Sequence, residues 1–572
     1  MGNNVIIRCK NKASNVTYIY YGTSNYDENG KCTTKGARKL IGKENSQQEF
    51  EPNKTFLLMT PEEQMATGLV DEPYYPVVDR GVVEDSVFEE KYYGYTAAVE
   101  AAAKKTGLYA AIKKVFPRNY LVMLSAVEQM MCMPNRQLYS PKRFHGTYWH
   151  TNIDALTENA ITTALEAVTP TERERFFNEF NKARKKEGEI IVALDTTSIS
   201  TYSSMLELAK YGYNKEGDNL EQINLLLVCD NESGIPIHYR SVAGNNADSV
   251  SVRASIENMK NEGVEKGAIF VMDRGFCTIE VMILLLRSGY SFLMCMPETC
   301  PFYREVMDAV IPTVGDTSNY IPTIERYCAT HDVKIECKRP GRGENAYTMT
   351  VYAYRDLQAK ADQEDAITKK FIDMFEKLKK DPSLYKPNSN YKKYFIKNED
   401  GTFSHNTEAQ NKRKSECGIF CLIGPKEMGA VKAHYTYKNR DCIEKDYEGW
   451  KVRMRRPRHS LEEHLEGKIF LLFMITVIET YIRNILDKAL LCTSRSLEDN
   501  MDVIFNARWR KPAGKKFQEG GWVDLTLDQM KMLHLLGVPG MDKFNSNIDN
   551  LVQNDILHRQ GKKAKRGRKS KK

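Results

Sequence analysis

Two apolar segments of the same form, each closed by an aspartate, constrain the fold of this chain more than any other feature. EIIVALDTTSIS (residues 189–200) and GAIFVMDRGFCT (residues 267–278) contain short runs rich in Ile and Val that end at Asp195 and Asp273. Such runs predict strands buried on both faces. Between them, INLLLV and IPIHYRSV predict two paired strands around a turn, and residues 247–263 have helical spacing. This order predicts an α/β sheet that carries both acids to an edge where ligands bind.

A second pattern lies in YKNRDCIEKDYEGWK, residues 437–451. An aromatic hydroxyl, a guanidinium, a carboxylate and an ammonium recur there at intervals that a helix would place within roughly 60° of arc. One carboxylate flanked by two cations suits a site that holds a divalent metal and a phosphodiester together. Mixed charges at this spacing are also common on solvated helix faces. The four residues are Tyr437, Arg440, Glu444 and Lys451.

The two strand-associated acids and this helix resemble the bacterial insertion-sequence transposases of the DDE class, in the subgroup with a Y-x2-R-x3-E-x6-K signature. The similarity covers residues 185–290 and 430–485, and it includes VMDRGF around Asp273 and the AGNNADS segment with Asn245 and Asp248. The resemblance implies an RNase H-like catalytic core. It also implies a catalytic, metal-binding triad and three contacts to the DNA end: Asp195, Asp273 and Glu444 for the triad, and Tyr437, Arg440 and Lys451 for the contacts.

The chemistry of three carboxylates in one cleft leads to the same metal requirement. Like charges at close range oppose one another unless cations neutralise them. Two divalent ions would do so, and they can activate a water or a 3′ hydroxyl and stabilise the leaving oxygen of a phosphoryl displacement. All-oxygen ligation favours magnesium or manganese over zinc. The predicted cofactor is therefore two Mg2+ or Mn2+ ions.

Each acid also has a purely structural interpretation. Asp195 precedes two threonines and could cap a strand end, and Asp273 could be a turn residue paired with Arg274. Glu448, one helical turn beyond Glu444, is an alternative third acid, but only Glu444 fits the spacing of the whole motif. A zinc cluster is an alternative for a group of residues without any close C-x2-C pair: Cys328, His331, Cys337, Cys417 and Cys421.

Basic residues are concentrated in two places. The last twelve residues hold eight basic side chains and no acid, and without them the basic and acidic residues are equal at 75 each. Such a segment predicts a flexible polycation for salt-sensitive phosphate contacts, or a tail that only increases solubility. A second patch directly follows the proposed catalytic helix, where a DNA backbone would have to run: Lys451, Arg453, Arg455, Arg456 and Arg458.

The whole chain, 572 residues long, predicts an α/β protein with several domains. The expected parts are an N-terminal β-hairpin module at 1–85, a helical domain at 86–185 that could bind the DNA end, an RNase H-like core at 186–298 and 431–485, a β-rich insertion at 299–430, a helical C-terminal module at 486–560 and a basic disordered tail at 561–572.

These features predict a DNA transposase of an insertion sequence, which cuts at terminal inverted repeats and joins the 3′ ends to target DNA. The expected partners are double-stranded DNA and, by family analogy, a second copy of the chain in a homodimer. The alternatives are an RNase H-like metal-dependent nuclease without strand transfer and an inactive transposase-derived DNA-binding protein.

No membrane partner is expected. The longest apolar run, Ile469 to Ile478, is far shorter than a membrane span and predicts a buried helix beside the Glu444 helix. Thirteen cysteines and no apolar leader after Met1 favour reduced thiols in a cytoplasmic, nucleoid-associated protein of a bacterium.

Overall fold

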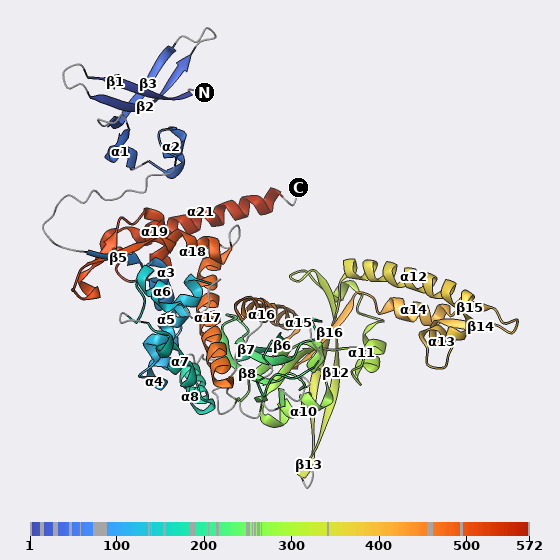
Figure 1. Ribbon diagram of the computed structural model, residues 1–572. Helices are drawn as coiled ribbons and strands as arrows, with labels where there is room; N and C mark the ends of the chain where they lie inside the picture. The colour runs from blue at the N-terminus through green and yellow to red at the C-terminus, as the bar shows by residue number, and fades with distance from the viewer. Residues whose placement is uncertain are drawn as a thin grey trace. The chain divides into compact units, whose positions relative to one another are not determined.

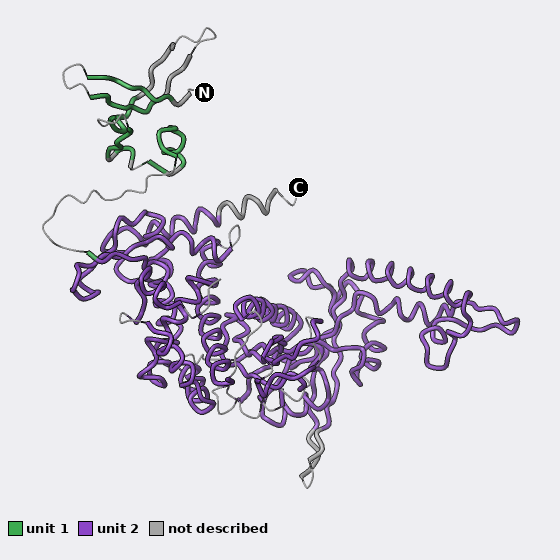
Figure 2. The backbone as a smooth tube through the Cα atoms, in the orientation of Figure 1, with its two compact units in different colours: residues 1–88 green, residues 89–572 purple. Residues whose placement is uncertain are grey.

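The computed structural model forms two compact units, residues 1–88 (unit 1) and residues 89–572 (unit 2), coloured separately in Figure 2. The structure describes the chain apart from residues 1–2, 12–15, 27–31, 45–48, 58, 72–87, 135–137, 139, 153–155, 183–188, 204, 213–216, 247–251, 254, 257–258, 260–263, 265, 340–341, 455–460, 492–495 and 570–572.

Unit 1 is built on a four-stranded antiparallel sheet in the order β1–β2–β3–β4. Its small apolar core consists of Ile19, Ile41 and Phe56, all fully buried. The helix α2 begins with a capping box, in which Thr60 and Glu63 satisfy each other's backbone N–H groups. The elements are β1 (Asn3–Lys10), β2 (Thr17–Tyr26), β3 (Cys32–Glu44), β4 (Phe50–Pro52), α1 (Lys54–Leu57) and α2 (Pro61–Ala66).

Unit 2 is organised around a nine-stranded sheet, part of which is labelled in Figure 1. Five of its strands are β6 (Ile191–Ser200), β7 (Gln222–Asp230), β8 (Pro236–Ala243), β9 (Ile269–Met272) and β10 (Ser291–Cys295). They run side by side in the order β8–β7–β6–β9–β10. The pairs β6–β7 and β7–β8 are antiparallel, whereas β6–β9 and β9–β10 are parallel. The predicted strand, hairpin and returning strand are therefore all present.

The register of β6 and β9 brings two predicted acids to neighbouring positions. The last residues of the parallel pairing, Leu194 and Met272, immediately precede Asp195 and Asp273. One prediction was wrong, because β6 does not end at Asp195 but continues to Ser200. The residues after Asp195 are β-branched or small, and they extend the antiparallel ladder with β7. Asp195 thus lies inside a strand, while Asp273 follows one.

Apolar cores cover both faces of this sheet. Val192 and Leu194 belong to one core, which also contains residues of α10 (Ile279–Ser288) and α11 (Tyr303–Val310). Ala193 points into the other, larger core. Burial on both faces explains why β6 and β9 are continuous apolar runs instead of alternating ones. In the predicted helix 247–263, the described residues Val252, Ile256 and Met259 are helical and buried in the first of these cores.

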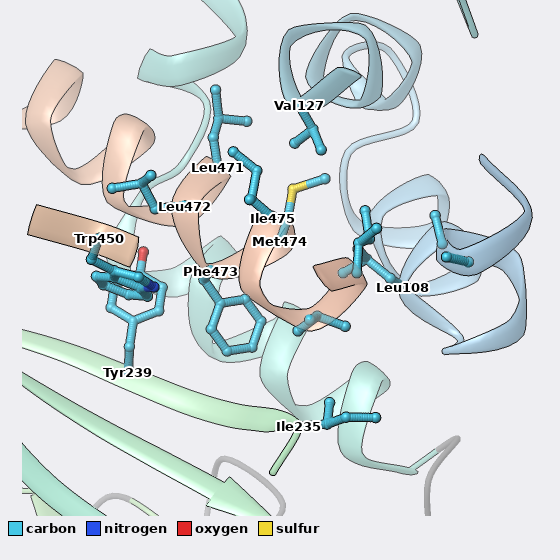
Figure 3. Close-up of a cluster of buried hydrophobic side chains, with 14 of the residues drawn as sticks. Leu108, Val127, Ile235, Tyr239, Trp450, Leu471, Leu472, Phe473, Met474 and Ile475 are labelled. Atoms are coloured by element: carbon cyan, nitrogen blue, oxygen red, sulfur yellow. The ribbon is translucent and has the colours of Figure 1, made fainter. Parts of the chain in front are cut away.

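The helix α17 (Glu462–Lys488) lies in the larger core. It is long and apolar enough to cross a membrane, but 72% of its most apolar window is buried inside the protein. Its Phe473 packs against Tyr239 of β8, and Tyr239 in turn packs against Trp450, as Figure 3 shows. The Trp450 indole donates a 2.6 Å hydrogen bond to the Thr476 hydroxyl. The predicted buried helix beside the Glu444 helix is confirmed.

Helices and a small sheet make up the flanking parts of unit 2. The three-stranded sheet contains β5 (Phe88–Tyr92), β17 (Arg508–Pro512) and β18 (Gly521–Val523). The segment 486–560, predicted to be helical, therefore also contains two strands. The helices are α3 (Gly94–Lys105), α4 (Leu108–Val115), α5 (Tyr120–Cys132), α6 (Pro141–Thr147), α7 (Glu158–Glu166), α8 (Pro170–Lys182), α18 (Leu497–Phe505), α19 (Leu527–Leu535), α20 (Met541–Phe544) and α21 (Ile548–Lys569), with a short 3-10 turn η5 (Phe517–Glu519).

The prediction of a disordered tail at 561–572 was wrong for most of its length, since α21 continues to Lys569. Lysine, arginine and alanine are good helix formers, and extending a helix that has already started costs less than beginning one.

The segment 299–430 contains both strands and helices. Its long strands do not form a separate sheet, because β16 (Ile419–Gly424) pairs with β10 and the rest extend the central sheet in the order β16–β13–β12–β11. Its second half is mainly helical. The further elements are η1 (Arg274–Phe276), η2 (Thr317–Asn319), β11 (Tyr320–Ile321), β12 (Arg326–Arg339), β13 (Arg342–Arg355), α12 (Leu357–Lys380), η3 (Pro382–Leu384), α13 (Asn390–Tyr394), β14 (Phe395–Lys397), β15 (Phe403–His405), α14 (Thr407–Ser415) and η4 (Lys426–Met428).

Candidate active site

The predicted single helix at 437–451 is instead two helices that meet at one residue. α15 (Ala430–Asn439) ends before Arg440, and α16 (Asp441–Met454) begins after it. At the junction the backbone bonds tighten to i→i+3, from Arg440 N–H to the Tyr437 carbonyl and from Ile443 N–H to the Arg440 carbonyl. The flanking Asn and Asp favour such an interruption, because their short polar side chains compete with helical backbone bonds.

Arg440 at this junction holds two of the predicted acids. One guanidinium nitrogen donates to the Asp195 carboxylate at 3.0 Å, and the other donates to the Glu444 carboxylate at 3.0 Å. The Arg440 and Asp195 side chains are only 10% and 14% exposed, whereas Glu444 is 59% exposed. Burial alone would lower the pKa of Arg440, but the negative charges of Asp195, Asp273 and Glu444 raise it above its ordinary value.

The third predicted acid, Asp273, contacts Tyr437 of α15. The Tyr437 hydroxyl lies 3.4 Å from an Asp273 carboxylate oxygen, at the long limit for a hydrogen bond. Burial raises the pKa of Tyr437, and so do the neighbouring Cys295 and Asp273. Its hydroxyl therefore stays protonated and acts as a donor. Asp195 of β6, Asp273 after β9 and Glu444 of α16 therefore lie around two side chains. These are Arg440 and Tyr437, at the α15–α16 junction.

The donor set fits divalent cations that prefer oxygen ligands, because all three predicted ligands are carboxylates. Within the described part of the chain, no group of three acidic, histidine or cysteine side chains is arranged closely enough to hold a metal ion. Positive charge between Asp195 and Glu444 comes instead from Arg440. Cys328, Cys417 and Cys421, which the sequence left open as zinc ligands, are buried.

Comparison with known families shows which family the chain belongs to. The family model described as the transposase DDE domain matches residues 186–478, just over half of the chain. The chain belongs to the DDE transposase family. A cryo-EM structure of the piggyBac transposase synaptic complex with hairpin DNA is similar over 81% of this chain and 84% of that chain, with 8% identity and a TM-score of 0.33. A comparison with curated proteins gave no match.

The predicted DNA contacts of this DDE transposase chain divide into three groups. Tyr437 and Arg440 lie at the acids, and Lys451 is partly buried on α16. Arg453 forms an ion pair with Glu479 of α17, and its side chain is 16% exposed. Arg455, Arg456 and Arg458 lie outside the described residues, as does Asp248.

Two residues at the site were missed in the sequence. The Tyr447 hydroxyl donates to the Asp195 carbonyl at 2.6 Å and lies 3.3 Å from the Leu225 carbonyl, which ties α16 to β6 and β7. Its position three residues after Glu444 is helical spacing, so the signal was present. Cys295 closes β10, and burial raises the pKa of its thiol, which also interacts with Tyr437. The apolar run that ends at Cys295 repeats the form that ends at Asp273.

Proposed function

We propose that this chain is a metal-dependent DNA transposase that cleaves DNA at terminal inverted repeats and joins the freed 3′ ends to target DNA. The observation that carries the proposal is the convergence of Asp195, Asp273 and Glu444 around Arg440 and Tyr437. These acids come from three separate elements and have the order and spacing of the predicted triad. The match to the transposase DDE domain supports the same reading.

An RNase H-like core is part of the proposal. The strand order β8–β7–β6–β9–β10, with two antiparallel and two parallel pairings, supports it. In that arrangement the central strand carries Asp195 and its parallel neighbour carries Asp273. Register alone brings these two acids together, and only Glu444 has to be supplied by a helix.

Asp195, Asp273 and Glu444 would together hold two Mg2+ or Mn2+ ions, which when bound would activate the attacking oxygen and stabilise the leaving one. The protein's own contribution is positional. Arg440 forms an ion pair with the Asp195 carboxylate and fixes its orientation. Exposed Glu444 completes the ligand set from the solvent side. Tyr437 presents a protonated hydroxyl beside Asp273, where a phosphate oxygen could accept it in place of the carboxylate.

The expected partners are double-stranded inverted-repeat and target DNA and a second copy of the chain, in a bacterial cytoplasm. An RNase H-like nuclease without strand transfer remains the rival enzyme, because hydrolysis and joining need the same acids and differ only in the nucleophile. An inactive DNA-binding derivative is the rival outside enzymes.

The decisive experiment supplies the purified chain with Mg2+, pre-cut DNA ends taken from the flanks of its gene, and a target plasmid. We expect covalently joined products. Hydrolysis without any joined product would favour the nuclease, and neither reaction would favour the binding protein. Glu444→Gln should abolish both reactions while end binding persists. The matched control is Glu448→Gln, one helical turn away and also exposed, which should leave activity unchanged.

A further inference from the structure

An arm of residues 357–415, from α12 to α14, extends from the central sheet (Figure 1) and has a core of its own. Its buried side chains form a cluster separate from both cores of the sheet. The arm is joined to the sheet at its base, where Asp356 caps α12 and forms an ion pair with Arg326 of β12 at 2.7 Å. The core residues are Phe371, Met374, Leu378, Tyr394 and Phe395.

Charge is divided along this arm. In the first 20 residues, 357–376, there are three lysines and five acids, and four of the acids pair with lysines of the arm at i, i+3 or i, i+4 spacing within α12. In residues 377–397 the balance reverses, with seven lysines and one acid. We call this distal segment the tip. Its lysines are all exposed: Lys377, Lys379, Lys380, Lys386, Lys392, Lys393 and Lys397.

The small apolar core of the arm brings together the elements that carry these lysines. Lys379 lies 4.4 Å from the Phe375 ring, and Phe375 stacks on Phe395 of β14 at 5.4 Å. Lys393 of α13 lies 5.1 Å from the ring of Tyr394, which packs against α12. The end of α12, α13 and β14 therefore present their lysines on one scaffold.

Most of the tip charge is not neutralised by the protein. Lys377 and Lys379 pair with Asp373 and Glu376 on the preceding turn. The single acid of the tip, Asp381, accepts the Ser383 N–H at 3.0 Å. Across the described chain, no carboxylate lies within ion-pair distance of the remaining tip lysines, which are Lys380, Lys386, Lys392, Lys393 and Lys397.

We propose that the tip binds the phosphate backbone of duplex DNA and forms a second DNA contact apart from the acids. Several exposed ammonium groups on a folded scaffold match a regularly charged polyanion. Lysine lacks the planar fork of arginine, so the contact holds the duplex without reading its sequence.

This inference rests on the proposed function only in that DNA is the substrate, so it is tested by binding without any reaction. The test variant is Lys386→Gln, Lys392→Gln and Lys397→Gln together. The matched control neutralises three lysines of the same arm that already have acidic partners: Lys360→Gln, Lys369→Gln and Lys412→Gln. Fluorescence anisotropy with a random-sequence duplex, in the full-length chain without divalent metal, gives affinity over a series of salt concentrations.

Each lost phosphate contact reduces the slope of log K against log salt by about 0.9. We expect the tip variant to lose about 2 to 3 in slope, and the control to lose less than about 0.5. Equal slopes for the two variants would overturn the inference. So would an unchanged DNA slope together with lost binding to poly-glutamate, which would assign the tip to an acidic protein. A chain that binds DNA through the tip but never cuts it would contradict the proposed function alone.

Discussion

Replacing Arg440 with methionine tests how the acids are held together when no metal is bound. Methionine keeps much of the side-chain volume but removes the charge, so Asp195 loses its ion pair at 3.0 Å while its side chain stays 14% exposed. Removing one partner of a buried pair costs about 3 kcal/mol or slightly more. The exposed Glu444 adds little to this loss, since solvent screens its charge. At about 2 °C per kcal/mol for a large unit, the unfolding midpoint should fall by about 6 °C.

The diagnostic result is the response to Mg2+, measured by thermal unfolding with and without the ion. If Asp195 and Glu444 hold a divalent cation, as proposed, that cation competes with Arg440 for the same carboxylates in the wild-type chain. In Arg440→Met that competition is gone, so Mg2+ should restore most of the lost stability and raise the midpoint by several degrees more than in wild type.

Arg453→Met is the matched control, because Arg453 also forms a buried ion pair, with side chains 16% and 15% exposed, but pairs with Glu479 away from the predicted ligands. It should lose similar stability without any additional gain from Mg2+. The reasoning is refuted if Mg2+ stabilises both variants equally, or if Arg440→Met is as stable as wild type.

Three further predictions concern a hydrogen bond at the site, a helix contact and a buried carboxyl group in unit 2. Tyr447→Phe removes the 2.6 Å hydrogen bond to the Asp195 carbonyl, and should cost about 1 kcal/mol of stability and lower the cleavage rate roughly tenfold; unchanged cleavage kinetics would contradict a positioning role. Gly467→Ala places a Cβ 2.6–2.7 Å from Leu165 atoms, backbone included. Overpacking should therefore cost about 2 kcal/mol of folding stability, more than the alanine gains in helix propensity. An unfolding midpoint above that of wild type would disprove this prediction. Burial raises the pKa of Glu128 to about 8 from an ordinary 4.5, so its contribution to stability is complete below pH 4.5 and is lost as pH rises toward 8. Glu128→Gln should flatten the fall of the unfolding midpoint over that range, and an unchanged pH profile would refute the assignment.

Much of the site could be anticipated, because its signals are local. The apolar runs before Asp195 and Asp273 identify strands, and the spacing of Tyr437, Arg440 and Glu444 identifies one side of a helical segment. The interruption at Arg440 was not anticipated, since periodicity alone does not distinguish one long helix from two helices joined by a tight turn. The ion pair of Arg453 was not anticipated for a related reason. A charge near the end of a helix looks exposed in the sequence, whereas Glu479 that neutralises it lies on another helix.

By itself, the sequence of this transposase determined which residues form strands and helices near the acids and which carboxylates are the candidate metal ligands. Both follow from hydrophobic period and short-range spacing. Only the tertiary structure decided that the strands of segment 299–430 extend the central sheet, that Tyr447 fixes the strand of Asp195, and that the tip lysines share one scaffold. These features depend on contacts between residues far apart in the chain, and no local pattern encodes which distant strand, carbonyl or ring a side chain will meet.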